Sequence, residues 1–305
     1  MKERITEEEP LSPMARVFQS PDVDYCVVTI MGFKTKICPD VLIDALKHNV
    51  SKLPRFSTKL TEDGSKWIET QVNVEDHVVV PYINPGEIDA EAVGVIRSHH
   101  SLGDGTSLIS LMLACTHKTS DPEDTSIPSL KRRETVLRNQ GWFLRSMFII
   151  GSTARLLWNT LVDMLLLLAT MFFLEDTKTP LKVGEDVGRN PKRFYHRAIS
   201  LDDIKLIKNA MNMAAATLFN QPVKNLTACV SNVVGPMDEI SFRGNPIAYI
   251  AFSSYGHSHA LLVHYISYAG KMIISLAVDP TIIPDPHKIC DDMEESLKSM
   301  KVALS

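Results

Sequence analysis

The feature that most limits the fold of this chain is a long apolar segment near its middle, Leu156–Leu174. Its length permits a transmembrane helix, which needs about 20 consecutive apolar residues. However, Arg155, Asn159 and Asp163 recur at every fourth position and would form one polar stripe along a helix. An aspartate near the centre of a lone span costs roughly 3 kcal/mol. Three interpretations therefore stay open: an interfacial or re-entrant membrane helix, which we favour, a true span, or a buried core helix.

The sequence on either side of this segment is typical of folded, water-soluble protein. The chain has 305 residues, of which 45% are hydrophobic and 22% charged, so it is long enough for about two domains and is not disordered. Strand-like and helix-like stretches alternate, which predicts a two-lobed α/β or α+β protein. We expect a flexible arm at 1–20, an N-terminal lobe at 21–130, a linker with the membrane-associated helix at 131–190, and a C-terminal lobe at 191–305.

Charge and cysteine content argue against several functional classes. A net charge of −4 and a pI near 6.2 provide no general basic surface for nucleic acid. The five cysteines are scattered and form no CxxC pair, which argues against a disulfide framework and against a structural zinc site. This pattern favours a reduced, cytosol-facing compartment. The start of the chain contains no apolar stretch of the kind found in secretory signals.

The sharpest chemical pattern is RSHHSLGDG, Arg97–Gly105. We expect a strand that ends at His99 and His100, a tight glycine-containing turn, and then a helix. A neutral imidazole held at a strand end could take a proton from a hydroxyl or thiol. Asp104 could cap the following helix or pair with a distant cation. On spacing alone, a surface turn with two solvated histidines remains the commoner explanation of such a pattern.

Other chemistries find less support in the sequence. Adjacent side chains on an extended backbone point in opposite directions, so His99 and His100 are poorly placed to share a metal, and no third ligand has suitable spacing. The GxSxG motif of serine hydrolases is absent, as are the glycine-rich phosphate-binding motifs GxxxxGK[ST] and GxGxxG. We therefore expect neither a metal nor a nucleotide-binding loop.

Several segments in the right order carry a family resemblance. HHSLGDG, His99–Gly105, fits the HHxxxDG signature of the wax ester synthase/diacylglycerol acyltransferase family. Ser231–His257 and Val278–Leu297 resemble the C-terminal domain of the same proteins, and the apolar segment with the residues that follow it resembles their middle part. The chain thus looks like a plant-type member of this family.

The resemblance implies an acyl-CoA-dependent O-acyltransferase with a two-lobed fold similar to that of chloramphenicol acetyltransferase. Acyl-CoA would be a co-substrate and no further cofactor is expected. The second histidine of the signature, His100, would be the general base, with His99 in a supporting role. Asp104 would hold the turn, Gly105 would permit close packing at the substrate tunnel, and Asn232 would line the acceptor side.

The resemblance also implies partners and a location. The acceptor would be a fatty alcohol, giving wax esters, or a diacylglycerol, giving triacylglycerol. The protein would bind a membrane surface, at the cytosolic face of the endoplasmic reticulum or, alternatively, at the plasma membrane, and could associate with full-length family members.

The chain departs from the family pattern in two places. Pro81–Asp89 stands where a PLW-type segment is expected, and Met213 continues almost directly into the strand at Ser231. We therefore expect an internally shortened member with an incomplete second lobe. Two functional hypotheses follow: an active acyltransferase, or a catalytically inactive isoform that binds acyl-CoA, membrane or a partner. A third, an unrelated binding protein with a chance HHxxxDG, is the weakest.

Overall fold

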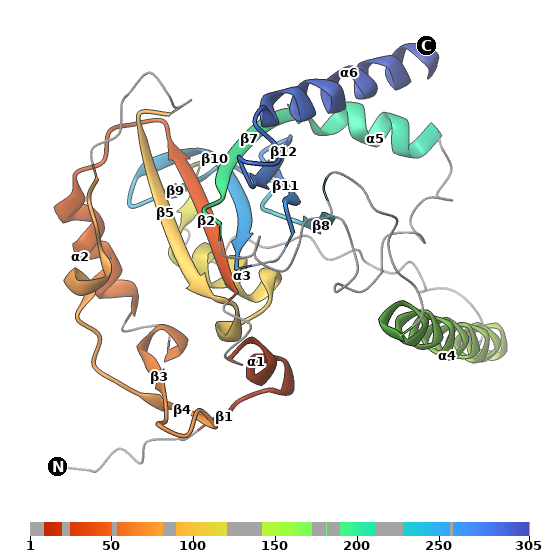
Figure 1. Cartoon of the computed structure of the whole chain (residues 1–305), viewed down its shortest axis with the longest axis horizontal. Coiled ribbons are helices and arrows are strands. Elements are labelled where there is room, and N and C mark those ends of the chain that lie inside the picture. The colour runs from red at the N-terminus through yellow and green to blue at the C-terminus, as the bar shows by residue number, and fades with distance from the viewer. Residues whose placement is uncertain are drawn as a thin grey trace.

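The N-terminal lobe is built on a five-stranded sheet with the order β5-β2-β10-β9-β6 (Figure 1). The computed structural model describes residues 9–19, 25–50, 54–81, 90–120, 142–172, 181, 190–210, 228–256 and 259–304. β-Branched and apolar residues dominate β2 and β5, as expected for strands in a packed sheet. The strands of this sheet are β2 (Cys26–Phe33), β5 (Ala92–His99), β6 (His117–Lys118), β9 (Ile240–Phe242) and β10 (Asn245–Tyr255).

The C-terminal lobe contains a four-stranded sheet with the order β7-β12-β11-β8. β11 and β12 form a hairpin through Ala269 and Gly270, which both have positive φ angles, as a tight hairpin turn requires. β8 lies at the edge of the sheet and runs parallel to β11. The strands are β7 (Arg193–Ser200), β8 (Ala228–Val233), β11 (Leu261–Tyr268) and β12 (Lys271–Val278).

The two sheets are joined because β10 comes from the C-terminal part of the sequence but lies in the N-terminal sheet. It pairs with β2 from Ile247 opposite Phe33 to Tyr255 opposite Cys26. β10 also contacts β11 and β12 of the other sheet. The division of the chain at 21–130 and 191–305 did not predict this exchange, so the lobes in space do not coincide with two segments of sequence.

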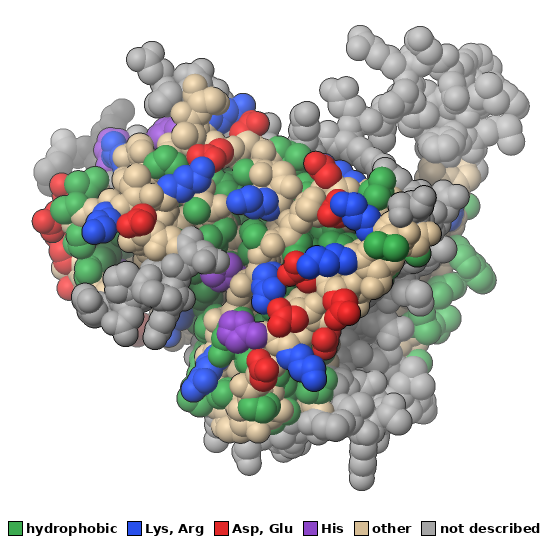
Figure 2. All heavy atoms as spheres, turned by 90° about the horizontal axis from the view of Figure 1, so that it is seen from above, with side chains coloured by type: hydrophobic (Ala, Val, Ile, Leu, Met, Phe, Trp, Pro, Cys, Tyr) green, Lys and Arg blue, Asp and Glu red, His purple; other side chains and the backbone are tan. Residues whose placement is uncertain are grey.

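Helices pack against both sheets. α2 (Pro39–Val50) and α3 (Gly105–Leu113) pack on the N-terminal sheet, where Ile109 and Leu113 are fully buried in its core. α5 (Leu201–Ala210) and α6 (Pro286–Leu304) lie together beside the C-terminal sheet (Figure 1). Acidic and basic side chains are interspersed on the face of the molecule seen from above (Figure 2). Ser200 caps α5 by accepting a hydrogen bond from the Asp203 N–H, as its sequence pattern predicts.

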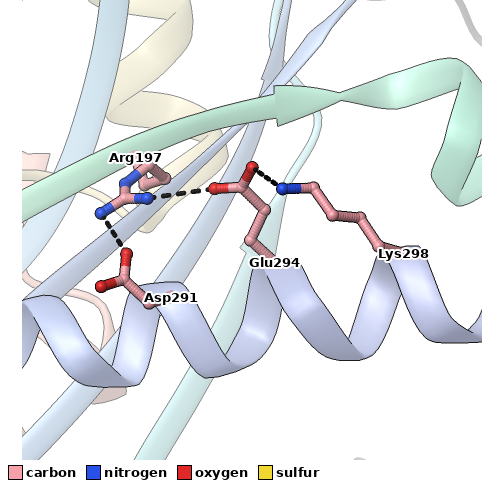
Figure 3. A network of polar contacts seen from close by, with 4 residues as sticks. All are labelled: Arg197, Asp291, Glu294 and Lys298. Carbon is pink, nitrogen blue, oxygen red and sulfur yellow. Dashed lines mark hydrogen bonds and ion pairs between the residues drawn. The ribbon is translucent and has the colours of Figure 1, made fainter.

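A network of ion pairs attaches α6 to β7 (Figure 3). The guanidinium of Arg197 lies 2.8 Å from an Asp291 oxygen and 3.0 Å from a Glu294 oxygen. Glu294 also pairs with Lys298 one turn later on α6. Exposed ion pairs of this kind contribute modestly to stability, so the apolar contacts beneath the helix carry most of its attachment.

The expected flexible arm at 1–20 is wrong for residues 9–19. These residues form β1 (Glu9–Pro10) and α1 (Pro13–Phe18), which is capped by the Ser12 hydroxyl. Leu11 and Ala15 are buried against Trp67, so burial of apolar surface orders the segment. β1 joins a small sheet with β4 (Lys66–Glu69) and β3 (Thr58–Leu60), and short 3-10 helices occupy Pro54–Ser57, Val74–His77 and His100–Leu102.

The central apolar segment forms α4 (Trp142–Phe172), which projects away from the two sheets (Figure 1). Leu157 and Trp158 are each 66% exposed, and Leu165 is 57% exposed. A buried core helix is therefore wrong, since these side chains pack against no other part of the described chain. None of the helices that the structure describes combines the length and apolar character needed to cross a membrane.

Candidate functional site

The HHSLGDG segment is a rigid turn between β5 and α3, as the sequence predicts. β5 ends at His99, a short 3-10 helix covers His100–Leu102, and α3 begins at Gly105. The His100 N–H donates a hydrogen bond of 2.8 Å to the carbonyl oxygen of Tyr25, immediately before β2. This bond continues the β2–β5 pairing by one residue and holds His100 at the end of the sheet.

The two histidines point to different surroundings. His99 Nδ1 accepts a hydrogen bond from the Ser101 N–H and lies 2.7 Å from the Ser101 hydroxyl oxygen. Gln19 donates to the same hydroxyl, which ties the end of α1 to the turn. His99 is thus engaged in holding the turn, consistent with the predicted supporting role.

The His100 imidazole lies on the ring of Phe18. The ring centroids are 4.3 Å apart and the planes are inclined by 24°. His100 Nδ1 is enclosed and finds no hydrogen-bond partner among the described residues, while the side chain as a whole stays partly exposed. Nε2 is therefore the ring nitrogen better placed to meet a substrate. α1, which the sequence did not predict, supplies Phe18 to the histidine pair, and Gln19 follows directly as the C-cap of the helix.

Asp104 caps α3, the first of the two roles that the sequence allowed. Its Oδ1 accepts a 2.7 Å bond from the Ser107 N–H and a 2.9 Å bond from the Thr106 hydroxyl. Hydrogen bonds from Ser107 chiefly lower the pKa of the Asp104 carboxyl, and Thr106 and the nearby His100 act in the same direction. The carboxylate therefore stays ionised and serves the turn, which suits an orienting role.

A side chain would be tolerated less well at Gly103 than at Gly105, because Gly103 has less room for a Cβ atom. A Cβ atom at Gly103 would lie 2.9 Å from the Ser107 Cβ, which is closer than real contacts allow. At Gly105 the nearest atom would be a methyl carbon of Val233 at 3.6 Å, an ordinary contact. The expected close packing thus falls mainly on Gly103, and Gly105 instead marks where the turn meets β8.

One face of β8 lies opposite the turn at His99–Gly105 and forms a wall beside it. Val233 lies beside Gly105, and at the other end of the strand the Cys229 thiol lies close enough to Tyr25 to help raise the pKa of its phenol, after burial as the main cause. Because side chains alternate along a strand, Ser231 shares this face. Ser231 is therefore the polar side chain of β8 turned toward the His100 turn.

Asn232 lies on the opposite face of β8. It is exposed and pairs in register with Tyr265 of β11. Tyr265 lines an apolar groove of about 480 Å³ beneath α5 and α6, on the side of the sheet away from His100. The structure thus places Asn232 on the face of β8 away from the His100 turn, and Ser231, one residue earlier, on the face toward it.

A third histidine, which the sequence analysis did not single out, lies next to Ser231. His264 of β11 pairs in register with Ser231, and its Nε2 is 3.4 Å from the Ser254 hydroxyl oxygen of β10. Burial lowers the pKa of His264 to about 4, so the ring is neutral near pH 7. Its spacing in the sequence carries no motif, so only the strand register could have revealed it. No cluster of metal-ligating side chains occurs among the described residues.

Comparison with known proteins identifies the family. Residues 164–301 match the model of the WS/DGAT C-terminal domain. Wax ester synthase/diacylglycerol acyltransferase 7 of Arabidopsis thaliana is 49% identical to this chain, and the match covers 98% of each protein. The chain belongs to the wax ester synthase/diacylglycerol acyltransferase family. Wax ester synthase/diacylglycerol acyltransferase 8 of the same plant is 46% identical over 98% of this chain and 97% of the relative.

A solved wax ester synthase/diacylglycerol acyltransferase shares the fold. The enzyme from Marinobacter aquaeolei VT8 matches with a TM-score of 0.57 at 13% identity, covering 97% of this chain and 99% of that chain. This likeness confirms the predicted two-lobed, chloramphenicol-acetyltransferase-like acyltransferase fold.

Within this family the chain is internally short. The match with wax ester synthase/diacylglycerol acyltransferase 7 extends over 470 positions, whereas this chain has 305 residues. Since the match covers nearly all of both proteins, the relative contains internal segments that this chain lacks. This confirms the predicted shortening. The two places at which we expect it, near 82–89 and 214–227, lie outside the described residues.

Proposed function

We propose that this chain transfers a fatty acyl group from acyl-CoA to the hydroxyl of a fatty alcohol or a diacylglycerol, with His100 as the general base. The observation that carries the proposal is the position of His100 at the end of β5, opposite the inner face of β8. Membership of a family whose relatives are named wax ester synthase/diacylglycerol acyltransferases supports the substrate class.

The reaction needs one proton to move twice. His100 Nε2 takes the proton of the acceptor hydroxyl while the oxygen attacks the thioester carbonyl carbon. The new C–O bond forms, the C–S bond breaks, and the imidazolium returns the proton to the departing CoA sulfur. Enclosure of Nδ1 directs the reacting nitrogen outward, and the stacked Phe18 ring fixes the plane of the imidazole.

The remaining motif residues would position this base. His99 secures Ser101 and, through it, Gln19 of α1. Asp104, as an ionised cap, fixes the start of α3 and transfers no proton. Acyl-CoA acts as a co-substrate in this scheme, and the chemistry calls for no other cofactor.

The test is an ester-formation assay on the purified full chain. Palmitoyl-CoA is supplied with hexadecanol or with dioctanoylglycerol, and ester product is measured by mass spectrometry. We expect ester from at least one acceptor and its loss in His100→Ala. Ester formation at the same rate in His100→Ala would exclude His100 as the base.

The alternative is a catalytically inactive member that binds acyl-CoA or a full-length relative. The observation that favours it is the internal shortening, since the relative contains internal segments that this chain lacks. Saturable binding of palmitoyl-CoA by the unchanged chain, without ester from either acceptor, would establish this alternative. Co-purification of a separately tagged full-length relative would test the partner role.

We further propose that α4 binds a membrane surface, on the cytosolic face of the endoplasmic reticulum or alternatively the plasma membrane. The exposed Leu157, Trp158 and Leu165 side chains support an interfacial helix. A two-lobed fold also needs both lobes on one side of a membrane, because β10 pairs with β2 across the chain. Protease should therefore reach tags at both termini in sealed microsomes. Protection of one tag alone would establish a span.

A further inference from the structure

A row of polar side chains crosses the inner face of the C-terminal sheet. His196 of β7 pairs in register with Ser275 of β12, Ser275 with His264 of β11, and His264 with Ser231 of β8. Residues paired in this way lie on the same face of a sheet, about 5 Å apart. The row therefore runs across all four strands.

This row faces β10, which lies between the two lobes. The His196 ring stacks on Tyr249 of β10 with centroids 4.1 Å apart, and His264 contacts Ser254 near the other end of β10. The neighbours of His264 on the same face of β11 are apolar: Leu262 and Ile266 are both fully buried. The polar row is thus set in an otherwise apolar interface.

Two groups in the row have hydrogen-bonding capacity that the described residues do not satisfy. His264 Nδ1 and the Ser275 hydroxyl oxygen are enclosed by protein atoms and have no partner among these residues. A buried polar group without a partner costs roughly 1–3 kcal/mol, so such groups are uncommon without a reason. A bound molecule that supplies the partner would recover this cost.

The row begins at the catalytic turn. Tyr25, which holds the His100 N–H, is close to Cys229, and Gly105 is close to Val233. Ser231 lies between Cys229 and Val233 on the same face of β8. It therefore faces the turn that carries His100, and His264 lies one strand farther from it.

We propose that His264 and Ser231 bind an ester carbonyl oxygen of a diacylglycerol acceptor, and that His264 is a specificity-determining residue for diacylglycerol over fatty alcohol. This inference rests on the proposed function and names the acceptor. A fatty alcohol has a single oxygen, which reacts at His100. A diacylglycerol carries ester carbonyls beside its reacting hydroxyl, and these need hydrogen-bond donors close to the base.

The chemistry of the neutral ring suits a carbonyl. The contact between the Ser254 hydroxyl and Nε2 allows either group to donate; in the tautomer that the proposal requires, Ser254 donates to Nε2 and the ring proton is on Nδ1, which donates to the carbonyl oxygen. The Ser231 hydroxyl provides a second donor. A charged ring would attract anions instead, but burial keeps this ring neutral.

The experiment measures binding, so that it does not depend on turnover. Isothermal titration compares dioctanoylglycerol with decanol for the unchanged full chain, His264→Leu, His264→Gln and Ser231→Ala. Ile266→Val is the matched control, because it alters the same face of the same strand without a polar group. Melting curves check that each variant folds, and Ser231→Ala provides the test if His264→Leu does not fold.

We expect His264→Leu and Ser231→Ala to weaken dioctanoylglycerol binding about five- to tenfold, the value of one neutral hydrogen bond, and to leave decanol binding unchanged. His264→Gln should recover part of the loss, and Ile266→Val should bind both ligands normally. Equal weakening for both ligands, or none for either, would overturn the proposal, as would absence of dioctanoylglycerol binding by the unchanged chain. Failure of the proposed function is distinguishable, because it appears as binding of both substrates without ester.

Discussion

The turn at His99–Gly105 and the face of β8 opposite it are organised in contrasting ways. In the turn, partners are near neighbours in sequence: His99 contacts Ser101, and Asp104 accepts from Ser107. In the wall, partners are far apart: Ser231 lies beside His264 through strand register. The proposed base is therefore specified by a short motif, whereas the proposed acceptor side depends on how distant strands align.

The largest effect should come from the turn. His100→Ala removes the base and should lower turnover roughly a hundredfold or more. His99→Ala should have a smaller effect, because the His99 ring contacts Ser101 and points in the opposite direction from the His100 ring. Steady-state rates with palmitoyl-CoA check both. A greater loss in His99→Ala than in His100→Ala would reverse the assignment of the two histidines.

The next largest effect is a loss of stability in acid that is caused by His264. The pKa of His264 is lowered to about 4 in the folded chain from an ordinary value of 6.5, so the unfolded chain binds the proton more readily between these values. Stability should thus fall as the pH drops from 6.5 to 4, by at most about 3 kcal/mol. His264→Gln should show a shallower pH dependence in urea unfolding. Parallel curves for the two proteins would mean that His264 is not buried as described.

A smaller effect is expected at the cap of α3. Asp104→Ala removes the acceptor for the Ser107 N–H and should cost about 1 kcal/mol of unfolding free energy. Asp104→Asn retains a capping oxygen and should keep more of both stability and activity. Thermal melts and rates, measured on the same samples, check this. Lost activity with an unchanged melting curve in Asp104→Asn would instead indicate a direct role for the charge.

The smallest effect tests the two faces of β8. Asn232→Ala should change turnover by less than about twofold, since the side chain is exposed on the face away from His100. Ser231→Ala should lower it more. Both are compared with diacylglycerol as the acceptor. The reverse order would show that Asn232, and not Ser231, acts on the acceptor.

What the sequence could predict follows the same division. The strand, turn and cap at His99–Gly105 depend on local hydrogen bonds, and the motif revealed them. The face of β8 to which Asn232 belongs could not be read from the motif, because a shift of one residue along a strand inverts every side chain. His264 belongs to no motif, and its importance appears only when β8 and β11 are aligned.

The same limit applies to larger elements. Polar and proline-containing sequence at residues 9–19 predicted a flexible arm, but Leu11 and Ala15 find Trp67 in the folded chain. Likewise, the apolar sequence of α4 permitted a core helix, yet no described element lies against its exposed face. In both cases, whether the segment is buried depends on an apolar partner that is distant in the sequence. A local sequence pattern does not contain this information.

The position of β10 has a consequence for biosynthesis. While the chain is being made, β2 and β5 emerge early, but the strand that completes their sheet follows only at Asn245–Tyr255. A two-stranded ribbon is marginally stable in water, so the unprotected edge of β2 must wait for most of the chain. The sheet of the N-terminal lobe is therefore completed only after most of the chain has been made, and until then the edge of β2 is open to pairing with other strands.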